Sequence, residues 1–494
     1  MAHPTTNETK ISIKVFVDKV KKRVVYAEAD HSFVDILFSL MTLPLGTIVK
    51  MLGKHADTKF EALGSLNNLY QSLKDIPESY FATEECKFML LNPRSLSYDH
   101  CKNLKLKIDR TKPVKYFICE SCRSKGYRTS CYYSICNKAI CKICGGLMNT
   151  PHSFDSSICV GDGGVFVSDI GNFIVTDDFY VMPYSVAGIF RLLTDLGIND
   201  TSHLEEIKLD MDSEQMVFLL KIALSLDSPF TRLIFHRNNP IRTGLVVYGH
   251  GSTSDRSAFI KKEKSTCSNI VLEISLQKLT GKLLFAEAKE DFAEFLFGLL
   301  SIPLGTVVGT LMNGASSISC MDNIFKSISN MSVGRYLKSQ DIKDMLLEPH
   351  FGQEYSSKNK LFPIKGTRTL LEVSMPNTSA ANQKSQVLKD MLLKKRCTAS
   401  YQLKDPRLNK QLLLQSSMFF VTNDLVISPS SSQLAMNTLN KLKVKLDDIE
   451  KYEISIGLEE VSNSKIKFFG LRLLKAALRS RSTLTSILEH HLKK

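Results

Sequence analysis

The sequence lacks the marks of a membrane-spanning chain. Residues 295–312 form a run of 18 residues without charge, but Pro303 and Gly305 interrupt it. A helix that crosses a bilayer needs about 20 apolar residues, so we expect two short buried helices here, joined at a Pro-Leu-Gly corner, and no transmembrane segment. The opening residues, MAHPTTNETK, have no basic region followed by an apolar one, so they do not indicate a secretory signal.

Several catalytic signatures are also absent. The sequence contains no Walker A loop, no GxGxxG after a strand, no GxSxG and no HExxH. It therefore offers no local motif for the corresponding nucleotide-binding enzymes, hydrolases or metalloproteases. Carboxylates are numerous, but no pair stands out. The sequence favours a protein without catalytic activity, although residues from distant segments can also build an active site.

The composition is that of a globular protein. Of the 494 residues, 43% are hydrophobic and 23% are charged, and at roughly 100–200 residues per domain the length corresponds to two to four domains. Lysine and arginine number 64 against 50 acidic residues, a formal net charge of +14. Eight of the 12 cysteines lie between Cys101 and Cys159. Such clustering without a secretory signal indicates metal binding in a reducing compartment, so we expect the cytoplasm or the nucleus.

An internal duplication organises the chain. The segment AEADHSFVDILFSLMTLPLGTIVKML, residues 27–52, aligns without a gap to AEAKEDFAEFLFGLLSIPLGTVVGTL, residues 286–311, with 13 identities in 26 positions. Self-similarity at a fixed offset is typical of a repeated structural unit. We therefore predict a first repeat over 1–248, a polar linker over 249–269 and a second repeat over 270–494.

Each repeat opens with the same order of elements. Residues 11–17 alternate between apolar and polar, a polar turn follows, and residues 24–27 return as a second strand. Residues 33–40 then carry apolar side chains at helical spacing. Strand–turn–strand–helix units without a βαβαβ rhythm favour an α+β fold. Later in each repeat, apolar residues at helical spacing predict one long amphipathic helix. It covers residues 214–235 in the first repeat and 465–492 in the second.

The strongest chemical signal is a cysteine-rich insert at about residues 115–150 of the first repeat. Two CxxC pairs, Cys119 with Cys122 and Cys141 with Cys144, are separated by 18 residues, a spacing found in zinc sites. Two tight turns can aim four thiolates at one point, and zinc prefers that tetrahedral arrangement. We predict one zinc ion per chain, held in a zinc-ribbon-like insert.

The predicted zinc site is closed and therefore structural. Four cysteine ligands leave no open coordination position for water or substrate. Two further cysteines, Cys131 and Cys136, lie between the two pairs, and either can replace a proposed ligand. The second repeat lacks the module, because only Cys397 lies in the comparable stretch.

Basic residues concentrate around these cysteines. Residues 101–150 contain 11 lysines and arginines against two acidic residues, with tyrosines and a phenylalanine interleaved. Positive charge attracts phosphates and aromatic rings stack on bases, so a nucleic acid is a candidate partner through this segment. The other interpretation is a solvated surface that offsets thiolate charge. No recognition helix, RNA-recognition motif or DNA-reading zinc-finger signature accompanies the segment.

The residues assembled so far resemble one family. The phrase VVYAEA…FVDILFSLMTLPLGTIV, the CxxC module and FIVTDDFYVMP are similar to the plant domain-of-unknown-function 674 family over nearly the whole chain, both copies included. The resemblance implies a land-plant source and an intracellular protein, and it supplies no reaction. The metal candidates that it carries over are the same four cysteines. Similar proteins often read CPxC at the second pair, where this chain has Lys142.

The sequence thus favours a non-enzymatic, zinc-stabilised scaffold that binds a protein partner. Two alternatives stay open. One is a nucleic-acid-binding protein that uses residues 101–150, and the other is an enzyme of unknown class with a cleft between the two repeats.

Overall fold

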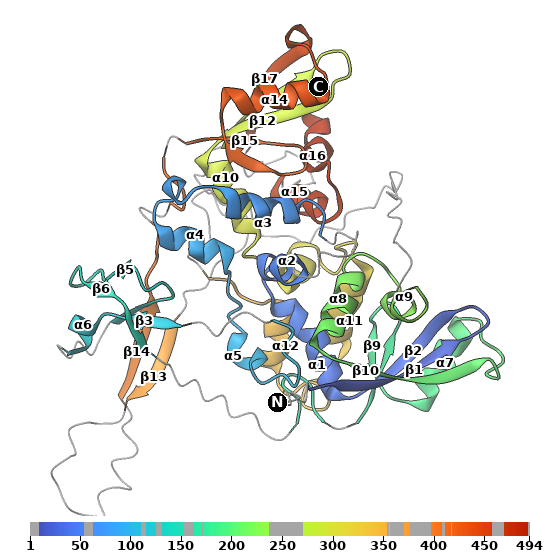
Figure 1. Ribbon diagram of the computed structural model, residues 1–494. Coiled ribbons are helices and arrows are strands. Elements are labelled where there is room, and N and C mark those ends of the chain that lie inside the picture. Colours follow the sequence, from blue (N-terminus) through green and yellow to red (C-terminus); the bar gives the residue numbers. More distant parts are fainter. Residues whose placement is uncertain are drawn as a thin grey trace, which may run out of the picture.

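The structure is a computed structural model, in which several small sheets lie around a central group of helices (Figure 1). Strands pair mostly with antiparallel neighbours, so the predicted α+β class is confirmed. The described residues are 9–53, 63–109, 115–124, 131–152, 163–169, 171–236, 270–352, 355, 370–375, 397–407, 411–415, 417–456 and 469–492.

Two five-stranded antiparallel sheets follow one strand order. The first sheet has the order β10 (Leu204–Met211), β1 (Ile11–Asp18), β2 (Arg23–Ala29), β8 (Phe173–Thr176) and β9 (Val181–Pro183). The second has the order β17 (Ile449–Ile456), β11 (Ile270–Gln277), β12 (Leu283–Lys289), β15 (Met418–Val421) and β16 (Ile427–Pro429). In each sheet a hairpin from the start of one predicted repeat lies at the centre.

The alternating pattern explains the central hairpins. Along β1, Ile11, Ile13, Val15 and Val17 are buried, whereas Ser12 and Lys14 between them are exposed. Successive side chains of a strand point to opposite faces of the sheet, which accounts for this alternation. The pairing of β1 with β2 shifts register between Phe16 and Val17, and that of β11 with β12 shifts between Ser275 and Leu276. The two bulges stand at corresponding places of the aligned segments.

A helix follows each hairpin and enters the core. The helix α1 (His31–Ser39) begins at Asp30, whose carboxylate accepts from the backbone N–H of Phe33 at 3.1 Å. Its counterpart α10 (Glu290–Leu299) is followed by the Pro-Leu-Gly corner and a short π-helical segment, Thr306–Leu311. The uncharged run is therefore split and buried, as predicted. Within the described residues, every helix is too short or too polar to cross a membrane.

The long helix predicted over residues 214–235 is wrong. The chain forms α8 (Ser213–Ala223) and α9 (Pro229–Phe235), with Pro229 at the first position of the second helix. Proline has no N–H for the helical ladder, so it starts a helix more easily than it continues one. The other predicted long helix is also divided, into α15 (Phe469–Arg479) and α16 (Thr483–Leu492), and residues 465–468 lie outside the described residues.

The remaining helices connect and cover the sheets. Helix α7 lies on the outer face of the first sheet and α14 on that of the second, where each completes a small apolar cluster. These helices are α2 (Leu45–Gly53), α3 (Leu66–Asp75), α4 (Glu84–Leu91), α5 (Tyr98–Cys101), α7 (Val186–Asp195), α11 (Ser319–Asn330), α12 (Gln340–Leu347) and α14 (Ser432–Leu442).

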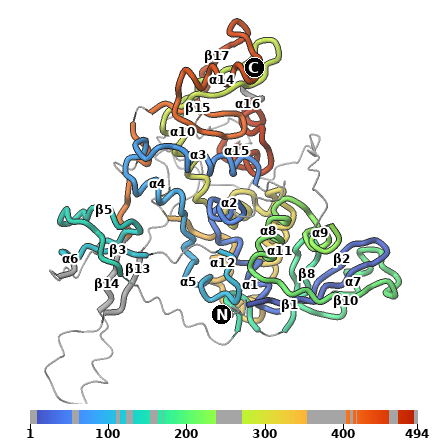
Figure 2. The backbone as a smooth tube through the Cα atoms, viewed as in Figure 1, coloured from blue at the N-terminus to red at the C-terminus, as the bar shows by residue number. Residues whose placement is uncertain are grey.

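Helix α3, from the first predicted repeat, packs on the second sheet, and helix α11, from the second predicted repeat, packs on the first sheet (Figure 2). The backbone N–H of Ile427 in β16 donates to Ser72 of α3 at 2.9 Å. In the same way, the N–H of Val181 in β9 donates to Ser327 of α11 at 2.8 Å. Each predicted repeat thus contributes a helix that packs on the sheet of the other repeat. One apolar cluster includes buried residues of both predicted repeats.

The Pro-Leu-Gly corners meet each other. Pro44 and Pro303 form an isolated antiparallel bridge, and Leu45 donates its N–H to the carbonyl of Ile302 at 3.0 Å. A Cβ on Gly305 would lie 2.8 Å from the carbonyl oxygen of Met41. Only glycine allows the two backbones to approach this closely, which explains the residue at that position.

A third sheet joins the cysteine-rich insert to the later part of the chain. Its order is β13 (Leu370–Met375), β14 (Cys397–Leu403), β4 (Cys131–Ser134), β3 (Tyr116–Ile118) and β7 (Thr150–His152). Strand β14 runs parallel to β4, and the other pairs are antiparallel. The insert therefore lies in a sheet to which both predicted repeats contribute.

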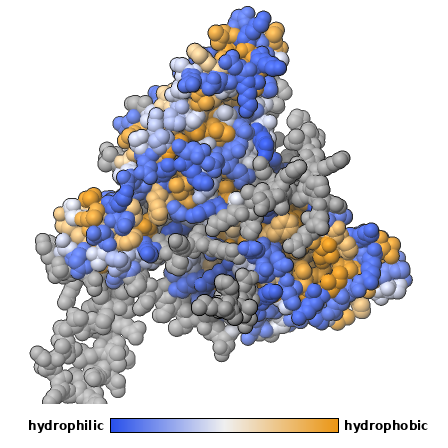
Figure 3. Space-filling model, in the orientation of Figure 1, coloured by the Kyte–Doolittle hydropathy of each residue, from blue (hydrophilic) through white to orange (hydrophobic). Residues whose placement is uncertain are grey.

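Several large apolar side chains remain on the surface. Phe190 and Val186 of α7 are 64% and 55% exposed, and Ile140 and Leu147 of the insert are 51% and 46% exposed. Figure 3 shows such apolar surface between hydrophilic areas on both of these parts of the molecule.

Candidate metal centre

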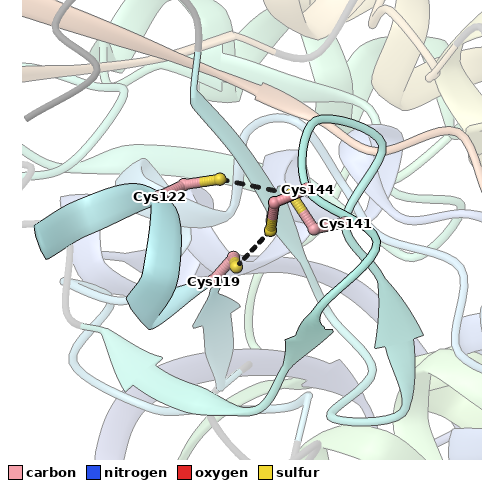
Figure 4. Close-up of side chains that lie close together, drawn as sticks. All are labelled: Cys119, Cys122, Cys141 and Cys144. Atoms are coloured by element: carbon pink, nitrogen blue, oxygen red, sulfur yellow. Dashed lines mark hydrogen bonds between the residues drawn. The ribbon is translucent and has the colours of Figure 1, made fainter. Parts of the chain in front are cut away.

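Two short structural units bring the four predicted cysteines together (Figure 4). Cys119 directly follows β3, and Cys122 lies on the short helix α6 (Glu120–Ser124). Cys141 and Cys144 lie in the turn between the two-residue strands β5 (Ala139–Ile140) and β6 (Leu147–Met148). All four side chains point to one place.

The sulfur positions suit a tetrahedral metal ion. The four Sγ atoms lie within 4.8 Å of one another. The Sγ atoms of Cys119 and Cys144 are 3.3 Å apart, and those of Cys122 and Cys141 are 3.6 Å apart. Metal–sulfur bonds of about 2.3 Å in a tetrahedron place sulfurs about 3.8 Å apart. These four cysteines can therefore hold a metal ion with little rearrangement.

The turn that carries the second pair is built by its backbone. Cys141 donates its N–H to the carbonyl of Gly146 at 2.8 Å, and Gly145 donates its N–H to the carbonyl of Cys141 at 2.9 Å. Gly145 has φ = +70°, a left-handed conformation that glycine adopts without strain. The N–H of Ile143 also points at the Sγ of Cys141, at 3.4 Å. Such a donor stabilises negative charge on the sulfur.

The four thiols have different environments. Burial raises the pKa of Cys119 and of Cys122 above the usual thiol range. Cys144 is exposed, and the backbone N–H of Gly146 is the main cause that lowers its pKa to about 7. A positive ion at the centre would favour the thiolate form of all four. Three buried sulfurs and one exposed sulfur leave the centre at the surface of the insert.

The two intervening cysteines behave differently from the proposed ligands. Cys136 is half-buried and stays outside the four-sulfur group. The side chain of Cys131 lies outside the described residues, although its backbone belongs to β4. Among the side chains that the structure describes, no other group of three or more metal-ligating residues gathers in this way.

The insert is anchored to α4 by two neighbouring glutamates, which the sequence did not suggest. Glu85 forms an ion pair with Lys404 at 3.1 Å, and both side chains are about nine-tenths buried, at 9% and 10% exposure. Glu84 pairs at 2.6 Å with Lys138 of the insert, but there both side chains are more than half exposed. Lys404 also donates its backbone N–H to the carbonyl of Tyr133 at 2.8 Å. The anchor therefore includes residues before and after the insert.

Two of the interleaved aromatic residues are used in packing. Tyr133 is fully buried and meets the ring of Tyr116 edge-on at 5.5 Å between centroids. The guanidinium of Arg94 lies 4.9 Å from the centroid of the Tyr116 ring. Tyr133 therefore cannot stack on a base, which weakens the nucleic-acid alternative. Lys105, Lys107 and other lysines of the basic segment remain exposed.

Comparison with known proteins gives one match. A family model described as "Protein of unknown function (DUF674)" covers residues 7–459, nearly the whole chain. No curated protein and no solved structure matches the chain.

Proposed function

Because the chain belongs to the DUF674 family, which is described as proteins of unknown function, we propose a function from its own geometry. The protein is a non-enzymatic interaction scaffold, and its cysteine-rich insert is a contact module stabilised by one zinc ion. The observation that carries the proposal is the group of four sulfurs within 4.8 Å of one another, together with exposed apolar side chains on the hairpin that holds two of them.

Zinc is the ion that best fits the donor set. Four thiolates in tetrahedral order are typical of structural zinc, and they occupy every coordination position. The insert has a small core of its own, made chiefly of three of the cysteines with Ala139 and Met148. A core of this size gives little stability by itself, so a metal ion would supply much of it. Thiolate ligands also require a reducing compartment, and we place the protein in the cytoplasm or the nucleus.

The contact surface lies on the same hairpin as two of the ligands. Ile140 and Leu147 are cross-strand partners on β5 and β6, and Ile143 stands between Cys141 and Cys144. These three apolar side chains are 51%, 46% and 42% exposed. Lys142 is exposed beside them. An apolar segment flanked by acidic residues would match this surface in both polarity and charge.

The overall architecture supports two repeats that act as one unit. The shared strand order of the first two sheets and the reciprocal exchange of α3 and α11 correspond to a duplicated unit paired with its own copy. We take the repeats as 1–248 and 270–494, with 249–269 as the linker. Because one apolar cluster spans both, they would form a rigid frame for the insert.

The test compares proteins captured by the full chain and by two variants. Ile143→Asp places a charge in the contact surface without removing a sulfur, and Val186→Asp makes the same change on α7, far away in the fold. We expect one defined partner to bind wild type and Val186→Asp and to be lost with Ile143→Asp, at equal metal content. Identical captured proteins for all three chains would contradict the proposal.

A further inference from the structure

One arginine lies where the insert meets the rest of the molecule. Arg94 follows α4 and donates from Nη2 to the hydroxyl of Tyr116 at 2.7 Å, on strand β3 of the insert. Its backbone N–H donates to the hydroxyl of Tyr355 at 3.3 Å. Arg94 therefore contacts two tyrosines, Tyr116 through its guanidinium and Tyr355 through its backbone.

Within the described part of the chain, Arg94 has no carboxylate partner. Its Nε is buried and has no hydrogen-bond partner, and among the described residues no aspartate or glutamate lies within 4.0 Å of it. Two other arginines that are partly or largely buried each lie near a carboxylate. Arg407 makes an ion pair with Asp405 at 2.7 Å, and Arg23 lies 4.0 Å from Asp18.

An enclosed cation without a counter-charge is unfavourable, so it requires an explanation. Removing a charged group from water is unfavourable unless an opposite charge and hydrogen bonds replace the water. The ring of Tyr116 gives a cation–π contact, but this neutral ring carries no net negative charge. A bound anion would supply that negative charge.

We propose that Arg94 anchors a binding site for a small oxyanion, a phosphate or a carboxylate group. A guanidinium presents donors in a planar fork that matches the oxygens of both groups. Arg94 is only half-buried, so part of this residue lies at the surface. The excess of basic residues over 101–150 would attract anions to this region. This inference goes beyond the proposed function and does not depend on the metal.

The experiment measures thermal unfolding of the full chain against rising inorganic phosphate and, separately, acetate, with chloride keeping ionic strength constant. The variants are Arg94→Gln and a matched control, Arg335→Gln. Arg335 also lies over a tyrosine ring, 5.1 Å from the centroid of Tyr336, but it is exposed. A ligand that binds only the folded chain raises the unfolding temperature with a saturable dependence on its concentration.

We expect one of the two anions to give a saturable rise in wild type and Arg335→Gln, with an affinity at least about tenfold weaker in Arg94→Gln. The more effective anion identifies the ligand class. Equal rises in wild type and Arg94→Gln, or no saturable rise with either anion, would overturn the proposal. If Arg94→Gln does not fold, Arg94→Lys, which loses the fork, takes its place, and wild-type affinity in that variant would also overturn it.

Discussion

At the scale of single residues, two adjacent glutamates form ion pairs that differ in burial. Glu85 is buried with Lys404, whereas Glu84 meets Lys138 at the surface. Breaking a buried ion pair leaves an uncompensated charge, and exposed pairs contribute little because water screens them. We therefore expect the Glu85–Lys404 pair, which reaches the insert through the hydrogen bond from Lys404 to Tyr133, to contribute more to stability than the direct Glu84–Lys138 pair.

We predict that Glu85→Ala lowers the free energy of unfolding by about 3 kcal/mol, while Glu84→Ala has a much smaller effect. The two changes are matched, since they remove the same atoms from neighbouring positions of α4. Urea unfolding followed by circular dichroism measures both. An equal decrease in the free energy of unfolding for the two variants would contradict a stabilising effect that depends on burial of the Glu85–Lys404 pair.

The residue scale also shows what local sequence can and cannot predict. The CxxC spacing limits where two sulfurs can point, so all four cysteines that it indicated lie together. Arg94 gave no signal, because its environment comes from Tyr116 and Tyr355, which are distant in the sequence. Chemistry that depends on one turn can be predicted, and chemistry that depends on tertiary contacts cannot.

At the scale of elements, two buried carboxylates hold loops against helices. Asp35 of α1 accepts from the backbone N–H groups of residues 165–167, two of them at 2.9 Å. Glu294 of α10 accepts from those of residues 412–413 at 2.7 and 2.8 Å. The two acids occupy aligned positions of the duplicated segment. An acidic residue within the same apolar helical pattern in both copies is the sequence signal for this contact.

These carboxylates make stability depend on pH. Burial raises the pKa of Asp35 to about 6 and that of Glu294 to about 7, whereas both acids titrate near pH 4 in an unfolded chain. The folded chain thus holds these protons more tightly. The resulting contribution to stability is complete below about pH 4 and is lost as the pH rises through about 6 to 7. It amounts to at most about 3 kcal/mol per group.

We predict that wild type loses stability from about pH 5 to about pH 8, and that the double variant Asp35→Asn, Glu294→Gln loses less. The amides cannot ionise, so their contribution does not change over this range. Denaturant unfolding across the range gives the two profiles. Parallel profiles for the two chains would contradict the assignment of the pH dependence to these acids.

Local patterns predicted several elements, but both predicted long helices are divided in the structure. Period-two alternation predicted β1, and helical spacing predicted α1, because both depend on neighbouring residues only. The segment 214–235 keeps apolar residues at helical spacing through a break between α8 and α9. Pro229 is the local sequence signal for that break, because proline starts a helix more easily than it continues one. Apolar periodicity alone does not show the break.

At the scale of the whole molecule, the predicted repeats are interleaved. Each lends a helix to the sheet of the other, and β14 completes the sheet of the insert by pairing with β4. Local patterns do not specify which distant segments pair, so the sequence predicted a duplication but not the exchange. One apolar cluster includes buried residues of both predicted repeats.

This interleaving predicts the behaviour of a cleaved chain. We insert a protease site within the predicted linker, residues 249–269, and cut the folded full-length protein. The two fragments should elute together from a sizing column and separate only in denaturant, because the buried cluster is common to both. Separation of the fragments in native buffer would mean that the repeats are independent domains.

The metal content of the purified chain is the most direct test of the central claim. Elemental analysis, without added metal during purification, compares wild type with Cys141→Ser and with the matched control Cys136→Ser, which removes a nearby sulfur outside the four-sulfur group. We predict about one zinc per chain in wild type and in the control, and loss of zinc with lower stability of the insert in Cys141→Ser. Absence of zinc from wild type, or full zinc content in Cys141→Ser, would contradict the account.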